Sequence, residues 1–154
     1  MTTGFRVAVV VSRYNDFVTD KLCTGALEGL AANGVAEQDV EVLHVPGAFE
    51  VPMAARRAAE TGRFDAVVCL GCLIRGETAH FEYIASAASQ GLMQAAGETG
   101  VPMAFGILTT DSAEQALARA ESGPSNKGWE AAAAAVEMAT LFRRLGDGRQ
   151  GAGA

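Results

Sequence analysis

The sequence predicts an α/β protein, a three-layer sandwich in which a four-stranded parallel sheet is covered by helices on both faces. Two observations predict this fold class. Four short runs of apolar and β-branched residues suit strands that are buried on both faces. Segments whose apolar residues recur every three or four positions alternate with these runs and suit amphipathic helices. Such an alternation is typical of parallel, flavodoxin-like sheets.

The expected elements are separated by glycine, proline or asparagine. The strands are expected at residues 5–11, 40–45, 65–70 and 103–108. The helices are expected at residues 17–32, 49–61, 79–98 and 128–145, with a short additional helix that Asp111 and Ser112 cap and that ends near residue 120. Residues 1–146 are therefore expected to form a single domain, and residues 147–154 a disordered tail.

The last expected helix carries two apolar stripes. One stripe holds Trp129, Ala132, Ala133 and Val136, and the other holds Ala134, Met138, Leu141 and Leu145. One stripe can pack on the sheet, whereas the second predicts a contact with another subunit. The alternative is a wide amphipathic face on a monomer.

Composition narrows the class of protein. The 154 residues are 49% hydrophobic and 19% charged, which suits one folded core. The net charge of −6 argues against a nucleic-acid partner, because such binders need a basic face. Cys23, Cys69 and Cys72 suit reduced thiols rather than a disulfide framework. Since no segment resembles a signal peptide or a membrane span, we expect a soluble cytoplasmic protein without a membrane partner.

The loop at residues 71–80 is the richest in chemical groups among the loops that follow the strands, where ligands of parallel sheets bind. Gly76 lets the backbone approach a ligand closely. Free N–H groups at Glu77 and Thr78, with the Thr78 hydroxyl, suit a phosphate. His80 is expected in the first helical turn beside that anion, where an imidazole can exchange protons near neutral pH. Arg75, directly before Gly76, is a further cation near the anion. On the pattern alone, an ordinary salt bridge for Arg75, a helix cap for Thr78 and an ordinary surface histidine for His80 are equally good interpretations.

Other charged residues have both a functional and a structural interpretation. Arg119 and Lys127 flank a break at Gly123, and each is either a phosphate contact or a solvated helix charge. Glu50, at a strand-to-helix junction, either accepts hydrogen bonds from a polyol or an amine or serves the helix dipole. His44 lies in a strand and is interpreted as structural. The pattern indicates acid–base chemistry on a small phosphorylated substrate.

Three patterns are not expected to carry chemistry. The GxGxxG at residues 146–151 follows a helix rather than a strand, so it does not predict dinucleotide binding. The CxxC formed by Cys69 and Cys72 begins inside a strand and opens no helix, which argues against a redox role. The scattered histidines and cysteines do not predict a zinc site, so no metal is expected.

Several segments together resemble the lumazine synthase family. They are residues 12–15 (Ser-Arg-Tyr-Asn), 45–50 (Val-Pro-Gly-Ala-Phe-Glu), 70–83, 105–110, 114–116 and 126–128 (Asn-Lys-Gly). The resemblance implies an enzyme that condenses 5-amino-6-(D-ribitylamino)uracil with L-3,4-dihydroxy-2-butanone 4-phosphate. The products would be 6,7-dimethyl-8-ribityllumazine, phosphate and water, in the penultimate step of riboflavin biosynthesis, with no metal or organic cofactor.

The resemblance also implies a role for each matching residue. His80 is implied as the acid–base catalyst and Arg119 as the phosphate-binding residue of the catalytic pair, with Glu77 and Thr78 at the same anion. Tyr14 matches the aromatic residue that stacks on the pyrimidine. The other implied substrate-binding residues are Asn15, then Ala48, Phe49 and Glu50 along the ribityl chain, Cys72, Leu73 and Ile74 in the pyrimidine-side loop, and Phe105 and Lys127 at a subunit boundary.

The sequence departs from the family pattern at a few positions. Tyr14 replaces the commoner Phe, Cys72 stands where Thr is frequent, and residues 120–125 lack the usual Gly-Thr-Lys-Ala-Gly pattern. The chain begins close to its first strand, which favours a free pentamer or a decamer over a capsid.

The resemblance implies small-molecule substrates, a homo-oligomer built from pentamers and a functional link to riboflavin synthase. The alternatives are a non-catalytic flavin- or lumazine-binding protein on the same scaffold, an enzyme that dismutates lumazine to riboflavin, and a flavodoxin-like electron carrier.

Overall fold

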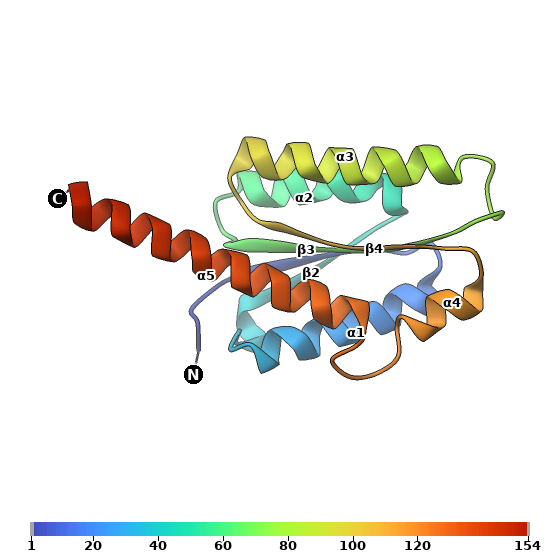
Figure 1. Ribbon diagram of the computed structural model, residues 1–154, viewed down its shortest axis with the longest axis horizontal. Coiled ribbons are helices and arrows are strands. Elements are labelled where there is room, and N and C mark those ends of the chain that lie inside the picture. The colour runs from blue at the N-terminus through green and yellow to red at the C-terminus, as the bar shows by residue number, and fades with distance from the viewer. Residues whose placement is uncertain (1, 154) are drawn as a thin grey trace.

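The computed structural model describes the backbone of residues 2–153 and the side chains of residues 2–146 (Figure 1). The strands are β1 (Val7–Ser12), β2 (Val40–Val45), β3 (Ala66–Ile74) and β4 (Met103–Thr110). The helices are α1 (Asp16–Ala32), α2 (Val51–Glu60), α3 (Phe81–Thr99), α4 (Ala113–Ala118) and α5 (Lys127–Gly153), with short 3₁₀ turns η1 (Glu37–Asp39) and η2 (Ala48–Glu50).

The four strands form one parallel sheet in the order β2-β1-β3-β4. Figure 1 shows α2 and α3 on one face of this sheet and α1, α4 and α5 on the other. Every residue of the central strands β1 and β3 is buried, because both faces of these strands are covered. The predicted three-layer α/β class is therefore confirmed.

Alternate residues of β1 divide the core into two layers. Val7, Val9 and Val11 pack with the apolar residues of α1 and α5, and Ala8 and Val10 pack with those of α2 and α3. This division follows from the strand period, since successive side chains point to opposite faces.

Two glycines let α1 and α5 pack unusually closely. A Cβ atom on Gly128 would lie 2.0 Å from the carbonyl oxygen of Leu22, and one on Gly29 would lie 3.0 Å from the carbonyl oxygen of Trp129. Backbone therefore meets backbone at this crossing, where any larger residue would separate the helices.

The last helix presents its two predicted stripes to different surroundings. Ala132 and Val136 are buried against the sheet, whereas Met138 and Leu145 are exposed. The sequence predicted an end near residue 145, but the backbone of α5 is helical to Gly153.

The GxGxxG pattern falls within this helix and not in a loop between a strand and a helix. The disordered tail expected at residues 147–154 falls where the structure describes no side chains, and it stays a prediction.

Three boundaries differ from the sequence prediction in ways that affect the loops. β3 continues to Ile74 rather than ending at residue 70, because its pairing with β4 runs as far as Thr110. The helix expected at 49–61 divides into η2 and α2. The helix expected to begin at residue 79 begins at Phe81, so residues 75–80 form a turn.

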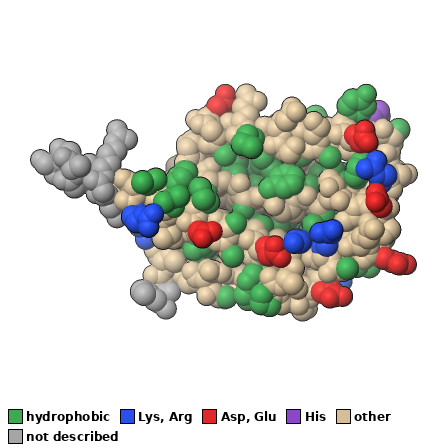
Figure 2. Space-filling view, viewed as in Figure 1, with side chains coloured by type: hydrophobic (Ala, Val, Ile, Leu, Met, Phe, Trp, Pro, Cys, Tyr) green, Lys and Arg blue, Asp and Glu red, His purple; other side chains and the backbone are tan. Residues whose placement is uncertain are grey.

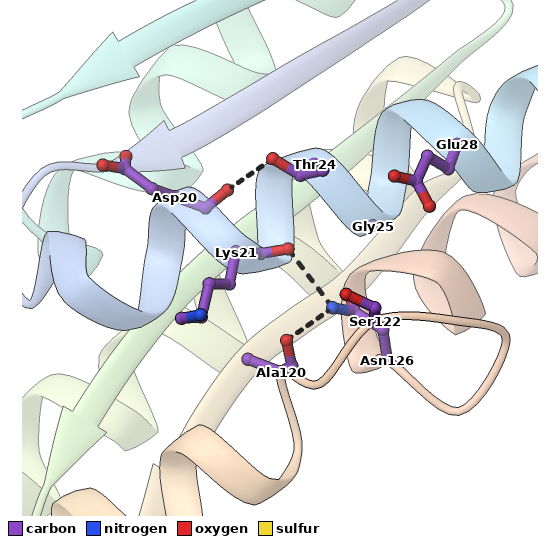
Figure 3. A pocket seen from close by; sticks show the side chains of 8 residues that line it. All are labelled: Asp20, Lys21, Thr24, Gly25, Glu28, Ala120, Ser122 and Asn126. Carbon is purple, nitrogen blue, oxygen red and sulfur yellow. Dashed lines mark hydrogen bonds between the residues drawn. The ribbon is translucent and has the colours of Figure 1, made fainter.

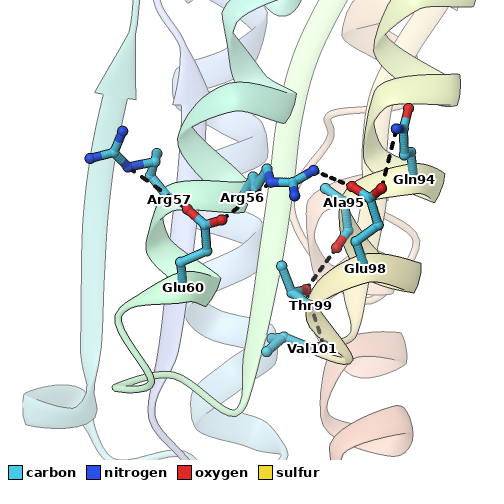
Figure 4. A network of polar contacts seen from close by, with 8 residues as sticks. All are labelled: Arg56, Arg57, Glu60, Gln94, Ala95, Glu98, Thr99 and Val101. Atoms are coloured by element: carbon cyan, nitrogen blue, oxygen red, sulfur yellow. Dashed lines mark hydrogen bonds and ion pairs between the residues drawn. The ribbon is translucent and has the colours of Figure 1, made fainter.

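A polar network joins α2 to α3 on the outer surface (Figure 4). Arg56 bonds Glu60 one turn along α2, at 3.3 Å, and also bonds Glu98 of α3, which accepts from Gln94 at 3.4 Å. The hydrogen bond from Arg56 lowers the pKa of Glu98 below its usual value. Because the ion-paired side chains are exposed, the network is expected to contribute little to the stability of the fold.

Candidate active site

An open cleft of about 410 Å³ lies where β1, β2 and β3 end. Its size suits a small organic ligand. The predicted site residues that line it are Tyr14, Ala48, Phe49, Glu50, Leu73 and Thr78. The cleft forms at this edge because the carboxyl ends of parallel strands meet there, as predicted for this fold class.

Backbone hydrogen bonds extend the sheet into the cleft wall. The N–H of Arg13 donates to the carbonyl of Val45 at 2.8 Å, and the N–H of Tyr14 donates to that of Pro46 at 3.1 Å. The rings of Tyr14 and Phe49 are 46% and 61% exposed at the cleft. Exposed aromatic faces on a rigid backbone provide a surface on which a planar heterocycle can stack.

Asn15 ties the end of β1 to the end of β3. Its backbone lies in the left-handed region, with φ 63°, which asparagine tolerates better than most residues. Its side-chain nitrogen donates to the carbonyl of Cys72 and to Oε1 of Glu77, both at 2.9 Å. The amide nitrogen is therefore engaged by the protein, and the amide oxygen is the atom that it can offer to a ligand.

Cys72 and Ile74 belong to the end of β3, not to a loop as the sequence predicted. Their side chains pack in the layer of α1 and α5, whereas Leu73 packs in the layer that contains the cleft. Because neighbouring residues of a strand point to opposite faces, Cys72 and Ile74 have only backbone groups to offer at the cleft.

The turn before α3 differs in detail from the predicted phosphate cradle. Gly76 adopts φ 92°, a left-handed conformation that favours glycine. The N–H of Glu77, predicted to be free, donates to the carbonyl of Ile74 at 3.3 Å. The Thr78 hydroxyl accepts from the backbone N–H of His80 at 3.1 Å, an ordinary turn contact that still leaves the hydroxyl hydrogen to donate.

His80 precedes α3 at the cap position instead of lying in the first helical turn. Its side chain is exposed, and its ring centroid is 6.3 Å from that of Tyr83. Thr78 of the same turn lines the cleft, whereas His80 itself does not.

The three candidate cations differ in whether a carboxylate already neutralises them. Arg75 bonds Asp111 at 3.0 Å and Glu82 at 3.3 Å. Its hydrogen bonds to Asp111 and then to Glu82 raise the pKa of Arg75 above its ordinary value. Its guanidinium also lies 4.9 Å from the centre of the Phe81 ring. Arg75 therefore fastens the turn to its neighbours.

Lys127 is neutralised in the same way, by Glu130 at 3.2 Å. Arg119 ends α4 with an exposed side chain and, among residues 2–146, forms no ion pair. Of the three candidates, Arg119 is thus the cation whose charge is available to a phosphate.

Phe105 and Lys127 lie on a different surface, at the outer edge of β4. They line a hollow of about 260 Å³ together with Glu130 of α5, and neither lines the first cleft. An adjoining apolar groove of about 380 Å³ runs from Phe105 to Phe142. Figure 2 shows hydrophobic side chains gathered in this hollowed strip between α3 and α5. One chain therefore carries the predicted site as two separate surfaces.

The cysteines do not form a redox pair. Cys69 packs in the layer of α2 and α3 and Cys72 in the layer of α1 and α5, so the sheet separates their thiols. Burial raises the pKa of Cys69 to about 12, and burial with the charge of Glu77 raises that of Cys72 to about 11. Both thiols stay protonated near neutral pH, which excludes the reactivity of a thiolate.

Among the described residues, no cluster of three His, Cys, Asp or Glu side chains is arranged to hold a metal ion. No helix in this part of the chain has the length and apolar character needed to cross a membrane.

Comparison with known proteins places the chain. The family model described as 6,7-dimethyl-8-ribityllumazine synthase matches residues 4–143. A 6,7-dimethyl-8-ribityllumazine synthase of Syntrophus aciditrophicus (strain SB) is 49% identical over 142 residues, which cover 92% of each chain. The chain belongs to the 6,7-dimethyl-8-ribityllumazine synthase family. The resemblance that the sequence segments indicated is thus confirmed, and the enzyme is favoured over the binding protein on the same scaffold.

In this member of the lumazine synthase family, the salt bridge that the sequence left open for Arg75 is formed, with Asp111 after β4 and with Glu82 of α3. Sequence reasoning missed Asn126, a buried residue directly before α5. Asparagine is a preferred capping residue directly before a helix, and this preference could have identified Asn126 from the sequence.

Proposed function

We propose that this chain catalyses the condensation of 5-amino-6-(D-ribitylamino)uracil with L-3,4-dihydroxy-2-butanone 4-phosphate. The products are 6,7-dimethyl-8-ribityllumazine, phosphate and water. The observation that carries the proposal is the cleft, where two exposed aromatic rings, the carboxylate of Glu50 and the turn of His80 converge in a chain of this family. The reaction is a transferase step of riboflavin biosynthesis.

The cleft supplies a complementary group for each part of the pyrimidine substrate. The ring stacks on Tyr14, and the ribityl hydroxyls donate to Glu50, beside Ala48 and Phe49 on η2. Asn15 and the backbone of β3 contact the polar edge of the ring. The half-buried carboxylate of Glu50 is a strong acceptor for the hydroxyls of a polyol.

The phosphate of the second substrate binds between the turn before α3 and Arg119. The turn contributes its backbone and the Thr78 hydroxyl, and Arg119 contributes a guanidinium that no carboxylate of the described chain neutralises. The proposal requires the ketone of the butanone to lie beside the primary amine of the pyrimidine when the phosphate is bound there.

The chemistry then needs correctly placed proton transfers. The amine nitrogen attacks the ketone carbon, and water leaves as the imine forms. The hydroxyl-bearing carbon next to the imine loses its proton, and phosphate departs from the adjacent carbon with the electron pair of its carbon–oxygen bond, which leaves an enol. The enol becomes a ketone, and the ribityl-bearing nitrogen attacks this ketone and closes the ring with loss of a second water. His80 takes and returns protons in these steps. Much of the acceleration comes from holding two reactants together, which converts a bimolecular step into a local one.

The separation of Phe105 and Lys127 from the cleft supports a homo-oligomer in which these residues complete the site of a neighbouring subunit. The exposed apolar strip beside Phe105 supports the same assembly, a pentamer or a multiple of pentamers. The reduced thiols suit a cytoplasmic enzyme. The product of the reaction suits a functional link to riboflavin synthase.

An assay of lumazine formation tests the proposed activity. Purified protein is mixed with both substrates, and absorbance is followed beside a protein-free blank, because the substrates condense slowly unaided. We expect clear acceleration over the blank and a loss of about 100-fold in kcat for His80→Ala, a magnitude typical of a general acid–base residue. A rate no better than the blank, with tight lumazine binding, would refute the enzyme.

A mixed-subunit experiment tests whether two chains share one site. His80→Ala and Phe105→Ala chains carrying different tags are co-expressed, and oligomers that contain both tags are isolated. If each site takes His80 from one subunit and Phe105 from its neighbour, each of these positions is native in about half of the sites. Random mixing of the two chains therefore gives about a quarter of the sites both native residues.

Activity of the mixed oligomer is therefore expected to exceed the mean of the two parent variants. Activity equal to the mean of the two parent variants would place both residues in one chain's site. A mixture of wild-type and His80→Ala chains serves as the control for subunit exchange.

A further inference from the structure

Asn126 is a polar residue buried at the junction of α1, the loop after α4 and the start of α5. Its side chain is 1% exposed, and it is among the largest fully buried side chains of the molecule. Figure 3 shows its amide reaching from the loop toward the backbone of α1. A buried amide at such a junction is costly unless each of its polar atoms is satisfied.

Both polar atoms of the Asn126 side chain are satisfied. Its nitrogen donates to the carbonyl oxygens of Lys21 at 3.2 Å and Ala120 at 3.0 Å (Figure 3). Its oxygen accepts from the backbone N–H groups of Gly128 at 2.7 Å and Trp129 at 3.2 Å. The side chain therefore caps α5 through its oxygen and fastens the loop to α1 through its nitrogen.

Two glycines let the helices pack closely against this amide. A Cβ atom on Gly25 of α1 would lie 2.2 Å from Oδ1 of Asn126, and one on Gly128 of α5 would lie 3.0 Å from the same oxygen. The bare backbone at both positions leaves room for the amide between the two helices.

Two hydrogen bonds from residues 126 and 127 hold the backbone at the end of α4, next to Arg119. The N–H of Lys127 donates to the carbonyl of Arg119 at 2.9 Å, and Asn126 binds the next carbonyl, that of Ala120. Residues 126 and 127 therefore close the loop back onto the end of α4. Arg119 lies where these hydrogen bonds join the loop to α4, and it has an exposed side chain and helical backbone angles.

We propose that Asn126 is a positioning residue for phosphate binding, which fixes the direction in which Arg119 leaves α4. This inference rests on the proposed role of Arg119 at the phosphate. Asparagine is required because the position must accept from two N–H groups and donate to two carbonyls. Serine can still cap α5 but cannot span to Ala120 and Lys21, and aspartate accepts but, when ionised, cannot donate.

A positioning role and a merely structural role predict changes in different kinetic constants: the first changes phosphate binding, and the second changes only the apparent kcat. Asn126→Ser and the isosteric Asn126→Asp are compared with Ser125→Ala, an exposed substitution in the same loop. The KM of each substrate is measured, together with the inhibition constant of inorganic phosphate. These constants refer to the folded fraction, so partial unfolding lowers only the apparent kcat.

We expect both Asn126 variants to raise the KM of the butanone phosphate and the inhibition constant of phosphate about tenfold, the effect of losing one charge-assisted contact. The KM of the pyrimidine and all constants of Ser125→Ala should stay within about twofold of wild type. A fall in kcat alone, with both phosphate constants unchanged, would overturn the inference.

Arg119→Ala distinguishes this failure from failure of the proposed function. If phosphate inhibits wild type and Arg119→Ala weakens that inhibition, the role of Arg119 stands and the Asn126 variants decide the inference. If Arg119→Ala leaves phosphate inhibition unchanged, the proposed phosphate site is wrong and the role assigned to Asn126 is wrong with it.

Discussion

Replacing Arg119 by alanine is expected to raise the KM of the butanone phosphate about 100-fold, because two charge-assisted hydrogen bonds to the phosphate are lost. The KM of the pyrimidine should stay within about twofold, since that substrate binds through the cleft of Tyr14 and Glu50. Steady-state kinetics with each substrate varied in turn measures both values.

Arg75→Ala is the matched control for this prediction. Arg75 lies in the same turn as His80, but Asp111 and Glu82 already neutralise it. Its removal should change the KM of the butanone phosphate by no more than about threefold, through slight loosening of the turn. A larger rise in this KM for Arg75→Ala than for Arg119→Ala would show that Arg75, and not Arg119, binds the phosphate.

Replacing Gly128 by alanine is expected to lower the free energy of unfolding by about 3 kcal/mol. The added Cβ would lie 2.0 Å from the carbonyl oxygen of Leu22, an atom of the α1 backbone that cannot rotate away. The two helices must separate to relieve this contact. Denaturant unfolding at a fixed protein concentration measures the change, because oligomer stability depends on concentration.

Gly97→Ala provides the control for the stability measurement. Gly97 lies in α3, is exposed, and a Cβ there would meet no atom within 4 Å. Alanine should therefore stabilise the helix by about 0.5–1 kcal/mol, since glycine loses more backbone entropy on folding. Equal destabilisation by the two substitutions would show that helix propensity, not the contact between α1 and α5, governs Gly128.

Much of the fold can be read from the sequence because its signals are local. The apolar run that includes Val7, Val9 and Val11 predicts a buried strand, and the change to a period of three or four residues predicts the helix that follows. The end of β3 was missed because Ile74 is held in the sheet by pairing with Thr110, a contact between segments distant in sequence. The start of α3 was missed because a turn stabilised by Thr78 precedes it.

The candidate site divides in the same way. The family resemblance implies Tyr14, Glu50, His80 and Arg119 as site residues, and their roles stay predictions. It was not sufficient to show which cation is available, since Arg75, Lys127 and Arg119 carry the same charge in the sequence. Only the folded positions of their carboxylate partners distinguish them.

The sequence by itself determined the alternation of strands and helices, the family and the residue types of the site, because hydrophobic period and motif are properties of the chain. Tertiary structure alone decided that Phe105 and Lys127 lie apart from the cleft and that Asn126 closes the loop of Arg119. These features depend on contacts such as that between Lys21 and Asn126, separated by 105 residues. No local pattern encodes such a contact, which forms only when both helices pack on the same face of the sheet.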